Sequence, residues 1–308
     1  GAIGGGREHE RGAAVALTAG VLPGVAIAPF HLEDDPERWR RAIRTSAADD
    51  PAFVLFASPR APVEEMVAWM DERWPVAVKV GALASGGALF LGDRTLTRGA
   101  VGLALTGDVV IDPVVAQGAR PIGPLMFVTR ASRNMVLELD GGPALTALER
   151  VHATLPPEEQ ELVKRGLCLG IAARDGQAQY KRGDFLVRAL VGVDPETQAI
   201  AVGGRVDVGS VVQLHVRDAR AAALELAELL ADHDHVTPSG ALLFSCVARG
   251  HGLFGVGDHD SALFTRAMGP VPLGGFFANG EIGPVQRRTC VHSQTSAFAL
   301  FRRRAAEA

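Results

Sequence analysis

The sequence predicts a mixed α/β (α+β) protein that contains two internally duplicated β-α-β-α-β-β units with mixed sheets. Three observations support this prediction. Short apolar runs of strand length alternate with longer segments of helical periodicity. The order of elements in roughly the first hundred residues recurs in the C-terminal third, and short stretches of the two regions match in sequence. The length of 308 residues favours about two domains, which we place at 1–107 and 108–308.

The first unit is predicted from apolar strands, helices and glycine-containing turns. The Pro23-Gly24 turn separates two apolar stretches, and a helix opens with Pro36, since proline is favoured in the first turn. The expected elements are strands at 14–22, 25–31, 52–57, 76–84, 88–91 and 100–105 and helices at 36–48 and 62–74.

The C-terminal third follows the same order. Asp258 or Asp260 is a plausible N-cap for its second helix. The expected elements are strands at 211–216, 241–246, 271–278 and 289–301, helices at 219–231 and 258–268, and a turn at Asn279-Gly280. In the connector between the two units we expect strands at 121–130, 135–140, 168–173, 185–193 and 199–202 and helices at 143–155 and 156–165.

Local matches support a duplication. Residues 53–58 resemble 242–246, and residues 81–87 resemble 275–281. Residues 1–6 resemble the end of the same unit, so we interpret them as the remainder of a further unit that has lost its start.

Composition excludes several classes of protein. A formal net charge of -4 with an isoelectric point near 6.2 gives no reason to expect nucleic acid or an anionic membrane as a partner. Three scattered cysteines form neither a disulfide framework nor a CxxC metal site, and they indicate a reducing, cytoplasmic compartment. Residues 12–30 carry no charge, but Pro23-Gly24 interrupts them, which favours two strands over a membrane span.

The glycine-rich loop 248–258 joins a strand to a helix and could present backbone N–H groups and Arg249 to an anion. The loop matches neither GxGxxG before a helix nor a P-loop. Cys246 ends the preceding strand, and His251 follows five residues later, a spacing that permits a Cys/His nucleophile pair without requiring it. A buried, inert cysteine is the alternative.

Two acidic stretches contain histidine, 232–235 and 258–260, but no HExxH or CxxC pattern supports a metal site, so none is predicted. A solvated acidic turn and a helix N-cap are the favoured interpretations.

Small polar residues also follow two matching strands. Asn279-Gly280-Glu281 corresponds to Ser85-Gly86-Gly87, and both strand ends could face one cleft. A type I′ turn is the structural alternative for Asn279-Gly280. Arg120 lies between turn residues and could hold a carboxylate bidentately, or else lie at the surface.

Three segments resemble a known family: 241–250 (ALLFSCVARG), 271–284 (VPLGGFFANGEIGP) and 117–124 (QGARPIGP). On these motifs the chain resembles FIST (F-box and intracellular signal transduction) proteins, with an N-terminal FIST domain truncated at its start and a C-terminal one. The resemblance implies a sensory module for a small ligand such as an amino acid, with a possible signalling partner. Some members bind haem and sense nitric oxide. Members often have Cys where this chain has Ala119, which makes a cysteine-dependent role at that loop doubtful.

We therefore expect a non-enzymatic, small-ligand-binding sensory protein, with an amino acid or similar metabolite as ligand and no assigned cofactor. The predicted ligand-binding residues are Ser85, Arg120, Cys246, Arg249, Asn279 and Glu281. A haem-binding gas sensor and a hydrolase that uses Cys246 with His251 stay open as alternatives.

Overall fold

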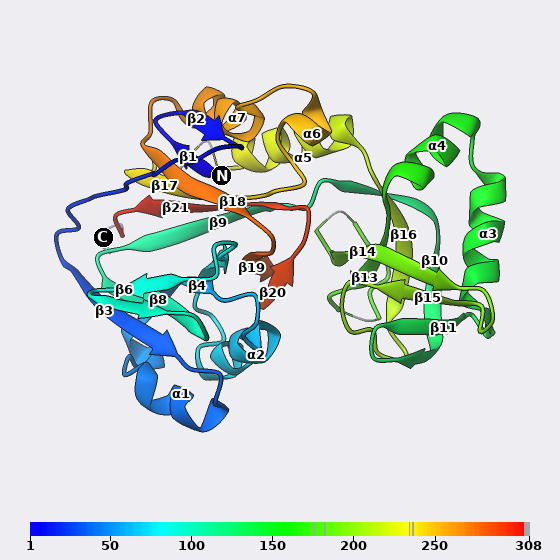
Figure 1. Ribbon diagram of the computed structural model, residues 1–308, viewed down its shortest axis with the longest axis horizontal. Helices are drawn as coiled ribbons and strands as arrows, with labels where there is room; N and C mark the ends of the chain where they lie inside the picture. Colours follow the sequence, from blue (N-terminus) through cyan, green and yellow to red (C-terminus); the bar gives the residue numbers. More distant parts are fainter. Residues whose placement is uncertain (175, 182, 234, 236, 305–308) are drawn as a thin grey trace. The chain divides into compact units, whose positions relative to one another are not determined.

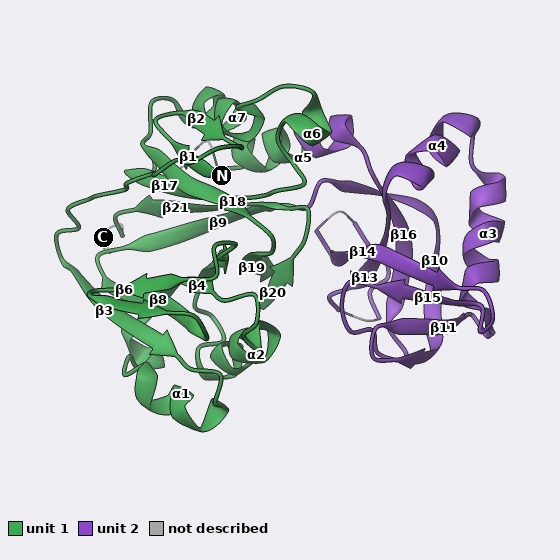
Figure 2. Ribbon diagram, in the orientation of Figure 1, with its two compact units in different colours: residues 1–116, 225–308 green, residues 117–224 purple. Residues whose placement is uncertain are grey.

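The computed structural model describes residues 1–174, 176–181, 183–233, 235 and 237–304. The chain divides into two compact units (Figure 2). Unit 1 combines Gly1–Ala116 with Glu225–Ala308, and unit 2 is Gln117–Leu224. These units follow contacts in space, whereas the expected domains 1–107 and 108–308 are continuous stretches of chain that stay a prediction.

Unit 1 contains two six-stranded sheets (Figure 1). Sheet A has the order β2-β1-β18-β17-β21-β9, and sheet B has the order β20-β19-β5-β4-β8-β3. The strands of sheet A are β1 (Ala2–Gly4), β2 (Arg7–His9), β9 (Val110–Ala116), β17 (Gly240–Cys246), β18 (Leu273–Ala278) and β21 (Ser296–Arg302). The strands of sheet B are β3 (Val25–Leu32), β4 (Ala52–Ala57), β5 (Lys79–Leu83), β8 (Ala100–Gly107), β19 (Glu281–Val285) and β20 (Arg288–His292). A separate pair consists of β6 (Leu89–Leu91) and β7 (Arg94–Leu96).

The two sheets share one pairing pattern. β17 lies parallel to β18 and antiparallel to β21, just as β4 lies parallel to β5 and antiparallel to β8. A hairpin then extends each sheet: β1–β2 pairs with β18, and β19–β20 pairs with β5. The hairpin that follows β18 in the chain therefore completes the other sheet. The duplication itself stays an interpretation.

One glycine is required in each parallel strand pair. Gly81 is in register with Leu55, and Gly275 is in register with Leu243. Their φ angles are +157° and +148°, and an added Cβ would lie 1.8 Å from the Leu55 carbonyl oxygen and 1.9 Å from that of Leu243. Neither position can hold a side chain. The two glycines therefore serve as reference points for matching the residues of sheet A with those of sheet B.

Helices cover the outer face of each sheet. The helices are α1 (Pro36–Ala42), α2 (Val63–Arg73), α5 (Ala219–Ala231), α6 (His251–Phe254) and α7 (His259–Met268), and a 3-10 turn spans Ala47–Asp49. Met66 and Met70 of α2 are buried against sheet B, and Leu226 of α5 and Phe264 of α7 are buried against sheet A. A third apolar cluster, which includes Val54 and Phe244, fills the space between the sheets.

Unit 2 is a seven-stranded antiparallel sheet with the order β10-β16-β13-β14-β15-β11-β12. Its elements are β10 (Ala119–Ser132), β11 (Met135–Leu139), β12 (Gly142–Pro143), α3 (Ala144–Thr154), α4 (Pro157–Gly166), β13 (Leu167–Ala172), β14 (Phe185–Asp194), β15 (Ala199–Val202) and β16 (Val211–Arg217). α3 contributes Ala144 and Val151 to the buried core of this sheet.

The predicted mixed α/β class is confirmed, but several local predictions were wrong. The helix expected at 36–48 ends at Ala42, because Ile43 is extended and buried. The strand expected at 14–22 does not form, because no described strand pairs with it. The strand expected at 289–301 is interrupted at 293–295, where the chain passes from sheet B to sheet A.

Asn279-Gly280 is not a hairpin turn. It joins β18 in sheet A to β19 in sheet B. A type I′ turn requires positive φ at both central residues, whereas only Gly280 of the two has it. No described helix is both long enough and apolar enough to cross a membrane.

Candidate functional site

The candidate site begins at the carboxyl end of β17, where Cys246 is 4% exposed. The Cys246 thiol hydrogen-bonds to the Glu281 carboxyl and to the backbone of Ala248 and Gln294. Burial, followed by the neighbouring Glu281 carboxyl, raises the pKa of Cys246 to about 11. The group is therefore a thiol at neutral pH and a weak nucleophile.

Arg249 lies three residues beyond Cys246 and is buried with a carboxylate partner. Its Nε donates to Asp260 Oδ2 at 2.8 Å, and its Nη2 donates to Asp260 Oδ1 at 2.9 Å. Asp260 also accepts from Ser245 Oγ at 3.1 Å and lies 2.9 Å from His259 Nδ1. Burial alone would raise the pKa of Asp260, but the Arg249 charge and the His259 ring hold it well below its usual range.

The third nitrogen of the Arg249 guanidinium, Nη1, is buried without a hydrogen-bond partner in the described part of the chain. The Phe254 ring lies 5.2 Å from the guanidinium carbon and stacks on His259 at 3.4 Å between ring centroids. An unsatisfied buried donor costs about 1–3 kcal/mol. Asp260 therefore binds two of the three guanidinium nitrogens, Nε and Nη2, and the third, Nη1, can donate to an acceptor.

Glu281 is fully buried at the start of β19. Its Oε1 accepts from the Gly280 backbone N–H at 3.3 Å, and its Oε2 accepts from the Thr295 backbone N–H at 3.2 Å. Burial outweighs these hydrogen bonds and the attraction of Arg249, and it raises the pKa of Glu281 to about 8. Glu281 is therefore mainly a neutral carboxylic acid at pH 7.

The loops of Ser85 and Asn279 lie side by side, although both residues are exposed. Leu83 N–H donates to the Gly280 carbonyl at 2.8 Å, so the end of β5 is tied to the β18–β19 connection. The structure thus brings Cys246, Arg249 and Glu281 together below the surface and places Ser85 and Asn279 at the surface beside them.

Arg120 belongs to unit 2. Its Nε contacts Asp218 at 3.1 Å, and its Nη1 contacts Glu159 at 3.0 Å. Both carboxylates belong to the same unit, and the side chain is 27% exposed. Its charge is therefore used within unit 2.

The Cys/His pair of the hydrolase hypothesis does not form in the described structure. His251 is exposed, and its backbone N–H donates to Glu10 Oε1 at 2.8 Å. Cys246 instead pairs with Glu281. The spacing of five residues permitted the Cys/His contact, but the short helix α6 holds His251 at the surface.

Among the described residues, no group of three or more His, Cys, Asp or Glu side chains could hold a metal ion. Asp234, within the histidine-containing stretch 232–235, lies outside the described residues. In the second stretch, the Asp260 carboxylate contacts the His259 ring and accepts from Arg249 instead.

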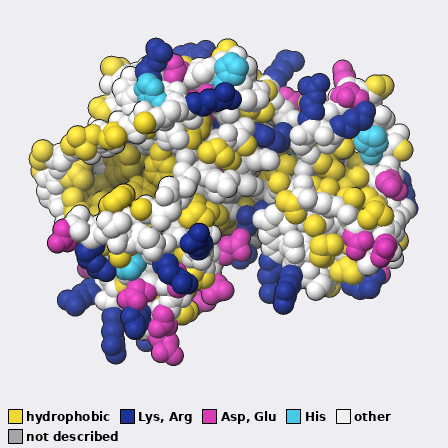
Figure 3. Space-filling view, viewed as in Figure 1, with side chains coloured by type: hydrophobic (Ala, Val, Ile, Leu, Met, Phe, Trp, Pro, Cys, Tyr) yellow, Lys and Arg dark blue, Asp and Glu magenta, His cyan; other side chains and the backbone are white. Residues whose placement is uncertain are grey.

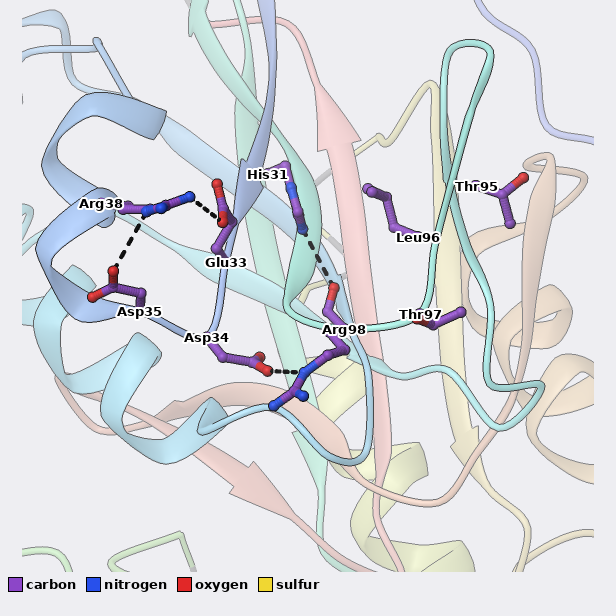
Figure 4. A pocket seen from close by; sticks show the side chains of 9 residues that line it. All are labelled: His31, Glu33, Asp34, Asp35, Arg38, Thr95, Leu96, Thr97 and Arg98. Atoms are coloured by element: carbon purple, nitrogen blue, oxygen red, sulfur yellow. Dashed lines mark hydrogen bonds and ion pairs between the residues drawn. The ribbon is translucent and has the colours of Figure 1, made fainter.

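Unit 1 also has a polar pocket of about 480 Å³ at the start of α1 (Figure 4). It is lined by His31, Glu33, Asp34, Asp35, Arg38, Thr95, Leu96, Thr97 and Arg98. Arg38 pairs with Glu33 and Asp35, and Arg98 pairs with Asp34 (Figure 4). The arginines are neutralised within the rim, and none of the sequence-predicted site residues lines this pocket.

Sequence reasoning missed two features of the buried cluster. Asp260 is predicted from the sequence as a candidate helix N-cap, whereas its side chain binds Arg249. Thr295 and Ser296 were hidden inside a predicted continuous strand, yet Thr295 binds Glu281 and the Ser296 hydroxyl is buried without a described partner. Helical spacing was the available signal: Asp260 lies four residues before Phe264 and so shares its face of α7, and an acidic residue on the core face of a helix needs a buried cation.

Comparison with known proteins identifies the family. The FIST N domain model matches residues 1–142, and the FIST C domain model matches residues 147–284. Uncharacterized protein Rv0628c of Mycobacterium tuberculosis (strain ATCC 25618 / H37Rv) is 42% identical over 249 residues, which are 78% of this chain and 65% of the relative. Uncharacterized protein Mb0898c of Mycobacterium bovis (strain ATCC BAA-935 / AF2122/97) is 41% identical over 236 residues, 74% of this chain and 61% of the relative.

This chain therefore spans slightly less than two thirds of the length of those relatives. The family predicted from the three sequence motifs is confirmed. The chain belongs to the FIST family, whose domains are sensory modules of signal transduction.

Proposed function

We propose that this chain binds a small amino-acid-like ligand at the cluster of Cys246, Arg249 and Glu281. The observation that carries the proposal is the buried Arg249 Nη1 without a described partner. A ligand carboxylate is the acceptor that best matches a guanidinium, because a charge-assisted hydrogen bond is about twice as strong as a neutral one.

Glu281 supplies the second half of the recognition. It is buried and mainly protonated at pH 7, because burial raises its pKa to about 8. A ligand ammonium group stabilises the ionised carboxylate, so binding releases the Glu281 proton. Recognition of both ends explains why an amino acid is favoured over a simple carboxylic acid.

Ligand entry requires the site to open, since Arg249 and Glu281 are at most 1% exposed. The segment between β17 and α7, residues 247–258, is the natural cover, because it contains exposed positions such as Val247 and carries Arg249 itself. Opening and closing of this segment would convert binding into a change at the surface that a signalling partner reads.

Thermal unfolding with each of the twenty amino acids tests the proposal. A ligand present at 100 times its Kd adds about 2.7 kcal/mol to the free energy of unfolding. Arg249→Lys keeps the charge but removes the planar donor set, and it should abolish the shift. Arg205→Lys changes an exposed arginine that pairs with Asp207 in unit 2, so it should leave the shift unchanged. If no amino acid stabilises the protein at millimolar concentration, the amino-acid proposal is wrong.

Calorimetry in buffers of different ionisation enthalpy tests the role of Glu281. At pH 7 the complex should release close to one proton per ligand, because the free Glu281 carboxyl has a pKa of about 8. The Glu281→Gln variant should release none.

The alternatives are distinguished by simple measurements. A Soret band after haemin reconstitution would favour the gas sensor. For the hydrolase, iodoacetamide should alkylate Cys246 in the folded protein at pH 8 as fast as in urea. We expect alkylation to be slower by roughly two orders of magnitude, because the thiol is buried and its pKa is about 11.

A further inference from the structure

Two segments of unit 1 have the sequence of sheet strands but belong to neither six-stranded sheet. Residues 13–19 (AAVALTA) resemble residues 101–107 (VGLALTG), which belong to β8 of sheet B. Leu105 of β8 is 2% exposed, whereas the matching Leu17 is 90% exposed and its neighbour Val15 is 96% exposed. An apolar strand pattern at full exposure indicates a missing neighbour.

The hairpin β6–β7 is the second such segment. It follows β5 in the chain as the hairpin β19–β20 follows β18. The other two hairpins each extend a six-stranded sheet, whereas β6–β7 forms a two-stranded sheet on its own, with Phe90 69% exposed. A lone two-stranded hairpin is only marginally stable in water, and a further strand paired with its edge would stabilise it.

The pairing rule of the two complete sheets predicts what is missing. Each hairpin completes the sheet of a different β-α-β segment: β1–β2 joins the sheet of β17 and β18, and β19–β20 joins the sheet of β4 and β5. The strand after β8, β9, pairs with β21, and the strand after residues 13–20, β3, pairs with β8. A third β-α-β segment would use β6–β7 as its hairpin and residues 13–20 as its antiparallel strand.

The surface on this side is apolar and hollowed. Figure 3 shows a hollow lined by hydrophobic side chains on the side of unit 1 where the segment between β2 and β3 passes. The cluster between the sheets leaves Phe56, Phe276 and Val25 only partly buried. Phe56 and Phe244 occupy matching positions and contact each other across the sheets at 5.7 Å between ring centroids.

We propose that unit 1 is a docking surface for a third β-α-β segment of the same pattern as β4–α2–β5 and β17–α7–β18. This occupant has an apolar first strand, a helix with an apolar face, and a second parallel strand with glycine at the position of Gly81 and Gly275. It pairs with residues 13–20 through the first strand and with β6–β7 through the second. The surface is independent of the proposed ligand site.

A second copy of this chain is a poor occupant. β4, β5, β17 and β18 each have strand partners on both sides within their own sheets, so a copy has no free β-α-β segment to offer. The relatives, in contrast, have about a third of their length outside the match to this chain. A β-α-β segment such as residues 52–83 is far smaller than that.

Coexpression with the part of Rv0628c that lies outside the match tests the docking surface. We expect a one-to-one complex in which the amide hydrogens of residues 13–20 and 89–96 exchange at least tenfold more slowly than in the chain alone. Leu17→Asp should weaken the complex at least tenfold, because it places a charge in the apolar strand. Val191→Asp changes an apolar residue of unit 2 that is 62% exposed, so it should leave the complex intact.

The chain alone provides a second measurement that does not depend on the probe. Residues 13–20 should exchange at the rate of an unstructured peptide, while β8 is protected. Protection of residues 13–20 in the monomer would overturn the proposal, and so would protection that arises only from self-association. A complex that leaves both segments unprotected would also overturn it.

Discussion

Sheets A and B have the same framework but different chemistry at the ends of their central strands. Counting from the residues paired with the required glycines, Leu243 and Leu55, Arg249 corresponds to Ala61. The backbone confirms this alignment, because Arg249 N–H donates to the Cys246 carbonyl at 2.8 Å and Ala61 N–H donates to the Ser58 carbonyl at 3.0 Å. The same turn therefore carries a buried guanidinium in one sheet and a methyl group in the other.

The helices that cover the two sheets differ in the same way. Asp260 of α7 and Met66 of α2 lie the same number of residues before Gly275 and Gly81, and both side chains are buried. At this helix position sheet B is covered by the apolar Met66 side chain, whereas sheet A is covered by Asp260, which pairs with Arg249. A buried ion pair contributes little to stability compared with an apolar pair of similar volume. We infer that the ion pair in sheet A serves binding, and that sheet B shows the framework without it.

The largest expected effect tests the shared framework. Gly81→Ala and Gly275→Ala should each lower the free energy of unfolding by about 4 kcal/mol or more, because the new methyl group meets a backbone oxygen at 1.8 and 1.9 Å. Chemical denaturation measures this loss. Gly86→Ala is the control, since nothing lies within 4 Å of its added Cβ. If one of the first two variants is as stable as the control, the two sheets do not share this constraint.

Removal of the Arg249–Asp260 ion pair tests the chemical difference between the two sheets. Asp260→Ala should lower the free energy of unfolding by about 3–5 kcal/mol, because it leaves Arg249 charged, buried and without its carboxylate. Replacement of both residues by methionine imitates the apolar filling in sheet B and should recover most of the loss. A double variant as unstable as Asp260→Ala would show that the lost volume, and not the lost pairing, causes the instability.

The stability of the folded chain should depend on pH through Glu281, which follows β18 of sheet A. The residue at the matching position after β5 of sheet B is Gly87, which cannot ionise. The unfolded chain releases the Glu281 proton near pH 4.5, and the folded chain releases it near pH 8. Between these values the folded state binds more protons, so stability falls as pH rises. The contribution is at most about 1.4 kcal/mol per pH unit.

Denaturation at a series of pH values checks this slope. Glu281→Gln should reduce it, whereas Glu72→Gln on the exposed face of α2 should not. An unchanged slope in Glu281→Gln would mean that other groups, such as the buried Glu8, whose pKa burial also raises, produce the pH dependence.

The sequence predicted much of this framework because its strands and helices carry strong local signals. The β-α-β order around β17 and α7 follows from apolar runs and turn residues alone. The main residues of the candidate site could be predicted from the sequence, but their contact with one another could not. Cys246, Arg249 and Glu281 were identified because each lies beside a glycine-rich loop, but their contact depends on the β18–β19 connection crossing between sheets. Residues 14–22 show the same limit, since an alternating apolar pattern specifies a strand only when a neighbouring strand is present.

The smallest expected effect compares two exposed ion pairs, one beside each sheet. Arg7 contacts Asp258 in front of α7, and Arg98 contacts Asp34 in front of α1, with the two arginine side chains 73% and 75% exposed. Each alanine substitution should change the free energy of unfolding by less than about 1 kcal/mol, and by less still in 1 M salt. A larger loss for Arg7→Ala would mean that this arginine supports the hydrogen bond from Glu8 N–H to Asp258 Oδ1, and through it the β1–β2 hairpin. The end of sheet A that carries Arg249 would then depend on a surface contact as well as on its buried ion pair.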